Sequence, residues 1–135
     1  SLPGGKSGTT VATLWAELGD AAGRWESFRH LQAEAGATPV TRQSGKHTAV
    51  SFRFACNKRL RHAAAQFAFV SLRLSDWARA YYRRQRALGH HHWEALRALA
   101  AKWLKIIFVM WRDRVLYQED RHLANIARQT LTQAA

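Results

Sequence analysis

Apolar residues recur at alternating spacings of three and four between positions 93 and 110, and this pattern constrains the fold more than any other feature. The residues are Trp93, Leu96, Ala100, Trp103, Ile107 and Met110. Such spacing places side chains on one face of a helix, as a packing seam of about two and a half heptads. Other elements must cover a seam of this length, so the sequence predicts a helical core.

Shorter helical patterns surround this seam. Gly19 and Gly36 are placed to end two short helices. Ser75 is placed to cap a fourth helix, which Gly89 ends, and a weaker helical pattern covers 119–130. The apolar stripes are Val11, Leu14, Trp15 and Leu18 in the first helix and Trp25, Phe28, Leu31 and Ala35 in the second. In the third, one face holds Leu60, Ala63, Ala64, Phe67, Ser71 and Leu74. We therefore predict an all-α fold with about six helices.

The segment 38–54 interrupts the helical pattern. Pro39, the Ser44-Gly45 pair and several β-branched residues favour a loop or a small β-hairpin there. At the start of the chain, Leu2-Pro3-Gly4-Gly5 before a short helix suits a helix-hairpin-helix turn, in which glycine amides approach a DNA backbone.

We find no internal repeat, low-complexity tract or dividing linker, so we expect one domain over 1–135. Within it, 1–75 is the serine-bearing, helix-hairpin-helix-like part and 76–135 is a helical extension. Because the chain begins at Ser1 and not at Met, we also expect a fragment of a longer polypeptide.

Charge is distributed unevenly along the chain. The formal net charge is +12, from 21 Lys and Arg against 9 Asp and Glu. Residues 1–40 hold three cations and four acids, whereas residues 41–135 hold eighteen cations and five acids. This imbalance attracts polyanions, first nucleic acid, then an anionic membrane surface, then acidic small substrates. The apolar fraction of 47 % argues against a disordered basic tail.

The single cysteine, Cys56, has no partner for an internal disulfide, and the longest apolar run, from Trp103 to Trp111, is interrupted by Lys105. A bilayer span needs about 18 or more apolar residues. With no signal-peptide pattern at the start, we expect a protein of the reducing cytoplasm.

A basic segment runs from position 42 to position 61 without a single acid. Three of its cations would lie in the first turns of a helix, where the macrodipole disfavours positive charge by a few tenths of a kcal/mol and a bound phosphate would reverse the sign. Free amides at that helix start could also bind the phosphate. The alternative is an ordinary solvated basic face. The six cations are Arg42, Lys46, Arg53, Lys58, Arg59 and Arg61.

Ser44 is the candidate nucleophile. It lies between Arg42 and Lys46, and a hydroxyl that attacks a phosphodiester needs such cations to stabilise the charge on the phosphoryl oxygens. Most Ser-Gly pairs are only turn residues.

Other candidate groups favour structure over chemistry. His90, His91 and His92 are consecutive and cannot all face one metal ion, and the acids show no spacing for two Mg²⁺ ions. The aromatic residues that interleave with arginines between Trp77 and Trp111 have helical spacing, so we expect most rings in the core and the arginines outside, facing phosphate.

Six motifs in order resemble the carboxyl-terminal domain of bacterial insertion sequence 110/116/902 transposases. They are SLPG at 1–4, LWAELGD at 14–20, TPVTRQSGK at 38–46, RFACNKRLR at 53–61, WARAYY at 77–82 and LRALAAKW at 96–103. The resemblance covers nearly the whole chain and departs from the family at Gly4-Gly5-Lys6-Ser7-Gly8, where the family has a more regular Pro-Gly-x-Gly turn.

The resemblance implies DNA recombination in which Ser44 becomes covalently joined to DNA. From their charge and their proximity in the sequence, we expect Arg42, Lys46 and Arg53 to position the scissile phosphate, and Lys58, Arg59 and Arg61 to hold the flanking backbone. As partners, the resemblance implies DNA, a structured guide RNA, a RuvC-like amino-terminal domain and further copies in a homo-oligomer. We expect no binding to a membrane and a location in the bacterial cytoplasm near the nucleoid.

The same resemblance implies no cofactor in this chain, because Mg²⁺ binds four acidic residues of the RuvC-like domain. We therefore expect the isolated chain not to cut DNA. The alternative function is a noncatalytic, basic helical nucleic-acid-binding module, and a third is binding to a membrane surface.

Overall fold

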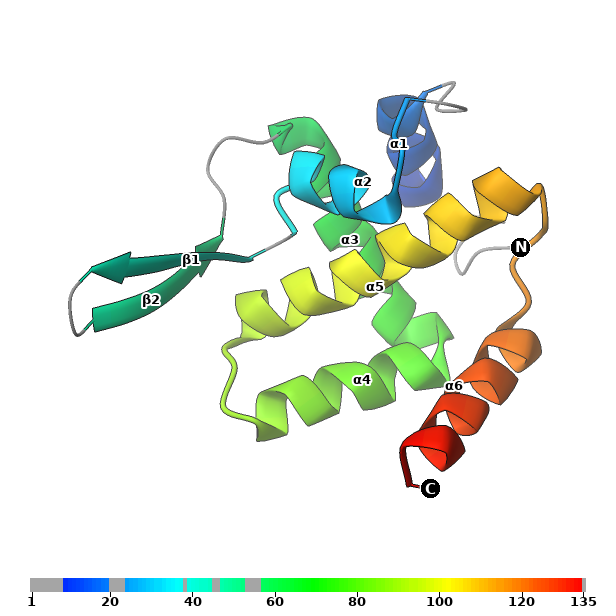
Figure 1. Ribbon diagram of the computed structural model, residues 1–135. Helices are drawn as coiled ribbons and strands as arrows, with labels where there is room; N and C mark the ends of the chain where they lie inside the picture. Colours follow the sequence, from blue (N-terminus) through cyan, green and yellow to red (C-terminus); the bar gives the residue numbers. More distant parts are fainter. Residues whose placement is uncertain (1–8, 20–23, 38, 45–46, 53–56, 135) are drawn as a thin grey trace.

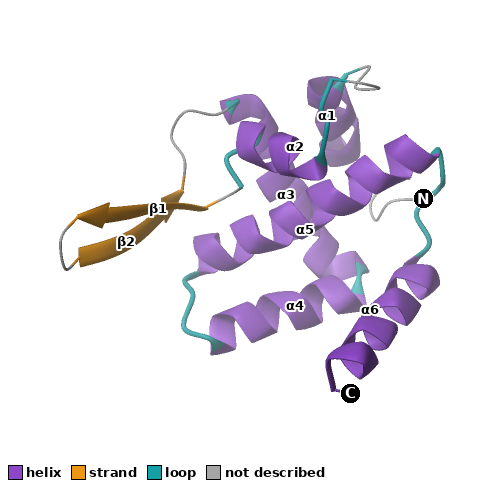
Figure 2. Cartoon of the chain, in the orientation of Figure 1, coloured by secondary structure: helices purple, strands orange, loops and turns teal. Residues whose placement is uncertain are grey.

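The computed structural model describes residues 9–19, 24–37, 39–44, 47–52 and 57–134, which form six helices and one β-hairpin (Figures 1 and 2). The prediction of an all-α fold with a hairpin near 38–54 is confirmed, whereas the helix-hairpin-helix-like start lies outside the described residues. The elements are α1 (Thr9–Leu18), α2 (Phe28–Glu34), β1 (Pro39–Ser44), β2 (His47–Phe52), α3 (Lys58–Leu74), α4 (Asp76–Ala87), α5 (His92–Asp113) and α6 (Glu119–Ala134).

The long helix α5 is the centre of the fold. Helices α2, α3 and α4 pack against it, and α1 packs against α3 (Figure 1). The predicted seam is confirmed at Leu96, Ala100, Trp103 and Ile107, which are buried. It is wrong at Trp93, whose side chain is 66 % exposed because it lies in the first turn of α5, at the rim of the core.

An aromatic cluster surrounds Trp103 in the middle of the core. Its ring centroid lies 5.1 Å from that of Phe67, 4.7 Å from that of Trp77 and 5.3 Å from that of Tyr117. The indole N–H of Trp103 donates to Ser71 Oγ at 2.9 Å. The polar atom of this buried ring is therefore satisfied, as a buried indole requires. The prediction that most aromatic rings pack in the core is confirmed for Trp77 and Trp103.

The helix ends follow the sequence closely, with one exception. Gly19 and Gly36, at φ values of 61° and 66°, follow α1 and α2 as predicted. Ser75 does precede α4, but its side chain makes no capping hydrogen bond. Its hydroxyl donates instead to Glu119 Oε1 at 2.6 Å. A hydrogen bond to an ionised carboxylate is stronger than one between neutral groups. This bond joins the start of α6 to the start of α4.

The hairpin leaves the helical body between α2 and α3 (Figure 1). Its strands are antiparallel, with Pro39 opposite Phe52 at one end and Ser44 opposite His47 at the other. No helix in the described part of the chain is long and apolar enough to cross a membrane.

Candidate nucleic-acid interface

The predicted site residues fall in two places, the hairpin and the first turns of α3. Arg42 and Ser44 belong to β1, and Lys58, Arg59 and Arg61 belong to α3. The other two predicted residues, Lys46 and Arg53, lie outside the described residues.

Ser44 occupies the last position of β1, at the turn end of the hairpin. In the strand register it is opposite His47, and Arg42 is opposite Ala49. Because strand positions two apart share a face, and directly opposed positions do too, positions 42, 44 and 47 lie on one face of the hairpin. Sequence reasoning did not single out His47. The signal was available, since a two-residue loop pairs the residues that flank it.

The start of α3 is capped by Asn57. Its side-chain oxygen accepts hydrogen bonds from the backbone N–H groups of Arg59 and Leu60, both at 3.1 Å. The expectation that free amides at this helix start bind phosphate is therefore wrong for these two groups. Asn is among the preferred N-cap residues, which is the signal that the sequence offered.

The side chains of the first turns remain available for a polyanion. Lys58 and Arg59 are exposed, Arg61 is partly buried, and the first turn contains no acid. Within the described residues, no carboxylate forms a salt bridge with Lys58, Arg59 or Arg61. Three cations at the positive end of a helix dipole are mutually unfavourable, so this surface gains stability when it binds an anion.

The fold brings a further cation to this surface. Arg97, from the early part of α5, lines the same pocket as Lys58 and Arg61. Sequence reasoning placed Arg97 only among the outer arginines, because its position in the same pocket as Lys58 and Arg61 depends on how α3 and α5 cross.

The arginines of α4 form a second basic region. Arg83 and Arg84 are exposed, which confirms their predicted position outside the core, and Arg86 is exposed as well. Arg79 instead supports the fold: its Nε donates to the Leu72 carbonyl at 3.0 Å. Only part of the α4 charge is therefore directed to solvent.

The three consecutive histidines lie at the start of α5, where His91 is the N-cap residue and His92 the first residue of the helix. This agrees with the prediction that they have a structural role at a helix start. The His91 backbone N–H donates to Glu94 Oε2 at 2.9 Å, and this bond lowers the pKa of the Glu94 carboxyl. His92 Nδ1 shares a hydrogen bond of 2.7 Å with the Tyr82 hydroxyl. Across the described ranges, no group of three or more His, Cys, Asp or Glu residues could hold a metal ion.

The fold and the site together define a basic helical domain with a serine at the end of a hairpin. Residues 1–83 match the family model described as Transposase IS116/IS110/IS902 family. The chain therefore belongs to this transposase family. The matched residues include Ser44 and the basic start of α3.

Three relatives are similar over most of the chain. A protein of Streptomyces coelicolor, named as the mini-circle transposase for IS117, is 37 % identical over 84 % of this chain and 27 % of its own length. The insertion element IS110 43.6 kDa protein of Streptomyces coelicolor is 34 % identical over 81 % of this chain and 27 % of its own. The insertion element IS900 42 kDa protein of Mycobacterium paratuberculosis is 35 % identical over 87 % of this chain and 29 % of its own. The chain thus spans little more than a quarter of these relatives.

Proposed function

We propose that this chain is the serine-bearing DNA-binding domain of an insertion-sequence transposase, and that Ser44 forms a phosphoserine bond with DNA during transposition. The observation that carries the proposal is the position of Ser44. It ends β1 at the turn of the hairpin, on the same face as Arg42, inside the segment that matches the transposase family. Membership of that family supports DNA as the substrate.

The proposed reaction is a reversible phosphoryl transfer. The Ser44 oxygen attacks the phosphorus of a phosphodiester, and the bond from phosphorus to the leaving sugar oxygen breaks. The serine proton passes to a base, and the leaving oxygen takes up a proton. A hydroxyl of another strand then attacks the phosphoserine and releases Ser44, so strands are rejoined without nucleotide hydrolysis.

The cations divide into two roles in this proposal. Arg42, Lys46 and Arg53 stabilise the charge that develops on the phosphoryl oxygens. Lys58, Arg59 and Arg61 hold the flanking backbone, a role supported by the absence of an acid in the first turn of α3.

The remaining partners are part of the same proposal. A RuvC-like amino-terminal domain holds Mg²⁺ on acidic residues, a structured RNA guides the choice of target, and copies of the protein assemble so that active sites combine both domains. The isolated chain then binds nucleic acid without cutting it.

The test uses the protein joined to its RuvC-like domain, incubated with element DNA and guide RNA. We expect Ser44→Ala to abolish a covalent protein–DNA adduct on denaturing gels and to leave DNA affinity unchanged. Ser51→Ala is the matched control, because Ser51 lies on β2 near the opposite end of the hairpin, opposite Val40. We expect this control to form the adduct normally.

An adduct that persists in Ser44→Ala would contradict the proposal. Retained, salt-sensitive binding with no adduct in the unsubstituted protein would instead favour a noncatalytic, basic helical nucleic-acid-binding module, which the exposed cations of α3 and α4 also support.

A further inference from the structure

A partly buried tyrosine on α4 holds two cations from two different helices. Arg84 Cζ lies 5.5 Å and Lys102 Nζ lies 5.7 Å from the centroid of the Tyr81 ring. Arg84 belongs to α4 and Lys102 belongs to α5. The ring attracts both cations through its negative face, so it fixes where they lie without neutralising their charge.

A second ring repeats this arrangement between α2 and α5. Arg29 Cζ lies 5.9 Å and Lys105 Nζ lies 4.8 Å from the centroid of the Phe28 ring. Lys102 and Lys105 are three positions apart on α5, so they are neighbours on the helix surface. Figure 1 shows α5 lying between α2 and α4. The four cations therefore form one line across three helices, the cation stripe, which consists of Arg29, Lys105, Lys102 and Arg84.

The charge of the cation stripe is not compensated by acids. All four side chains are exposed. Within the described part of the chain, none of them forms a salt bridge with a carboxylate. Two like charges held beside one ring repel each other, and a bound anion removes that repulsion. The cation stripe is therefore a surface that gains stability when a polyanion covers it.

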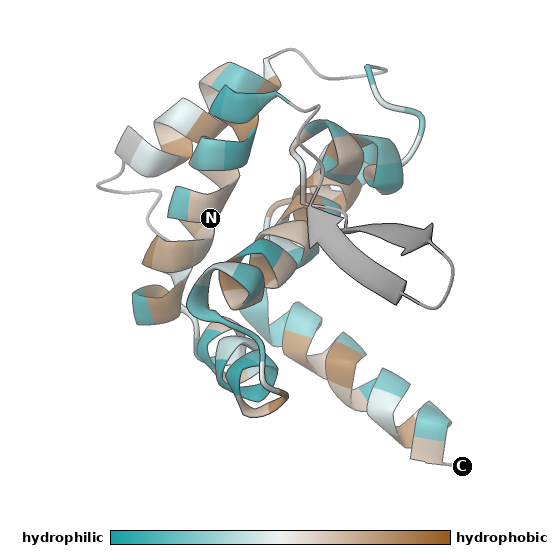
Figure 3. Cartoon of the chain, turned by 90° about the vertical axis from the view of Figure 1, so that its left-hand side faces the viewer, coloured by the Kyte–Doolittle hydropathy of each residue, from teal (hydrophilic) through white to brown (hydrophobic). Residues whose placement is uncertain are grey.

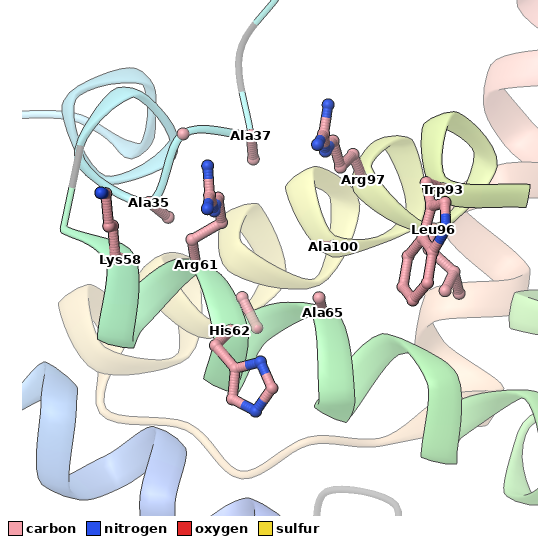
Figure 4. Close-up of a pocket in the computed structure, with 12 residues that line it drawn as sticks. Ala35, Ala37, Lys58, Arg61, His62, Ala65, Trp93, Leu96, Arg97 and Ala100 are labelled. Atoms are coloured by element: carbon pink, nitrogen blue, oxygen red, sulfur yellow. The ribbon is translucent and has the colours of Figure 1, made fainter. Parts of the chain in front are cut away.

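The cation stripe is separate from the basic start of α3. Lys58 and Arg61 line a pocket between the end of α2 and the first turns of α3 and α5 (Figure 4). No member of the cation stripe lines that pocket. The proposed reaction uses the cations of the hairpin and of α3, and it leaves those of the cation stripe without a role.

We propose that the cation stripe binds the phosphate backbone of duplex DNA, as a second contact away from the strand that reacts. Transposition joins an element to a target, so the family to which the chain belongs acts on more DNA than that one strand. The inference rests on the proposed function only in taking DNA as the partner, and it does not depend on Ser44.

The length of the cation stripe favours a polymer over a small anion. Neighbouring helix axes are roughly 8–10 Å apart, so a line across three helices is roughly 16–20 Å long. One strand of a duplex carries a phosphate about every 3.4 Å along the axis. A single phosphate would meet only part of the cation stripe, whereas a duplex backbone can meet all of it.

The two rings argue against other modes of binding. Phe28 and Tyr81 are partly buried and have cations over them, so a base that stacked there would displace a cation. Neither ring is among the exposed apolar side chains that an interfacial helix inserts into a membrane. Contact through cations alone reads no base edges, so binding should not depend on base sequence.

The first experiment measures binding of the 135-residue chain to fluorescent duplex DNA by anisotropy over a range of salt concentrations. We expect the double variant Lys102→Gln, Lys105→Gln to weaken binding roughly 2- to 30-fold, the effect of losing two exposed ion pairs. The slope of log affinity against log salt should become shallower by about 2, because two fewer phosphates are contacted. A duplex of unrelated sequence should give the same changes.

The matched control is the double variant Arg121→Gln, Arg128→Gln. It removes the same charge from exposed positions of α6, outside the cation stripe. We expect this control to keep the salt slope of the unsubstituted chain. Equal losses in the two double variants would overturn the proposal in favour of attraction by net charge alone. Unchanged affinity in Lys102→Gln, Lys105→Gln would overturn it as well.

Substitution of the ring tests whether Tyr81 positions its two cations. Tyr81→Phe keeps the ring and should bind duplex DNA like the unsubstituted chain, whereas Tyr81→Leu should weaken binding roughly 2- to 5-fold. This loss should disappear in a chain that already carries Arg84→Gln and Lys102→Gln, because no cation is left to position. A loss that persists in that chain would overturn the positioning role of the ring.

Two other polyanions test the choice of partner. The same double variants are titrated with an RNA duplex and with phosphatidylglycerol vesicles. A larger loss for Lys102→Gln, Lys105→Gln on the RNA duplex than on DNA would overturn the assignment to DNA, and a loss confined to vesicles would overturn the assignment to nucleic acid. Every readout is an affinity and needs no covalent adduct, so failure of the Ser44 experiment and failure of this one are distinguishable.

Discussion

Helices α5 and α6 both carry apolar residues at helical spacing, yet they are held in different ways. Seven residues of α5 are buried, whereas none of the described residues of α6 is buried. Figure 3 shows α6, which ends at the C label, standing away from the other helices with apolar bands along it. Leu123, Ile126 and Leu131 are 42 %, 39 % and 71 % exposed. The apolar spacing that predicts a helix therefore does not by itself place that helix in the core.

Helix α6 is attached to the rest of the fold by two contacts of its first turn, a hydrogen bond and a contact between rings. Glu119 accepts the hydrogen bond from Ser75, and the ring of His122 lies 4.5 Å from that of Trp77. The contrast teaches that α5 depends on area removed from water, whereas α6 depends on a few specific atoms.

The largest effect should come from the centre of the α5 interface. We expect Trp103→Ala to lower the free energy of unfolding by about 3–5 kcal/mol, because it leaves a cavity among the rings of Phe67, Trp77 and Tyr117. Urea denaturation followed by circular dichroism measures this change.

The matched substitution in α6 is Leu131→Ala, which removes an apolar side chain that is 71 % exposed. We expect a change within about 0.5 kcal/mol. A loss comparable with that of Trp103→Ala would contradict the contrast, because it would mean that α6 is buried in solution.

A smaller effect should come from the hydrogen bond inside the α5 interface. Ser71→Ala removes the acceptor of the Trp103 indole N–H and leaves a buried donor unsatisfied. We expect a loss of about 1–3 kcal/mol in the free energy of unfolding.

Ser75→Ala is the comparison for this substitution, since Ser75 is also buried but bonds to Glu119 of α6. We expect its effect to appear mainly as faster amide hydrogen exchange in α6, with little change in α5. Equal exchange in both helices would show that α6 unfolds only with the core.

Local patterns predicted the elements, and long-range contacts decided the details. The seam of α5 was predictable because burial repeats along it, but the spacing could not tell how far the covering helices extend, so Trp93 was misplaced in the core. The position of Ser75 before α4 was also predictable. Its bond to Glu119 was not, because that partner lies 44 positions away along the chain.

The candidate site follows the same division. A basic segment with Ser44 in a turn could be recognised from residue types alone. The pairing of Ser44 with His47 requires the loop length, and the presence of Arg97 in the same pocket as Lys58 requires the crossing of α3 and α5. The loop length is a local signal that the sequence contains, whereas the crossing of two helices is a property of tertiary structure that residue spacing does not encode.

The smallest expected effect concerns pH and the attachment of α6. Burial lowers the pKa of His122, an effect that nearby Lys102 reinforces and Glu119 opposes. Its Nε2 is buried without a hydrogen-bond partner among the described residues. The folded state therefore favours the neutral form of His122, whereas the same imidazole in the unfolded chain takes up a proton near pH 6.5. Stability from this contact is present above that pH and is lost as the pH falls below it, because the unfolded state then binds more protons.

The measurement compares the free energy of unfolding of the unsubstituted chain and of His122→Phe between pH 8 and pH 5. Phenylalanine keeps a ring beside Trp77 but cannot be protonated, and the other six histidines are common to both chains. We expect the unsubstituted chain to lose more stability on acidification, with the difference growing below pH 6.5. Two superimposable pH profiles would mean that water reaches His122 freely, and the first turn of α6 would then be as loosely held as the rest of that helix.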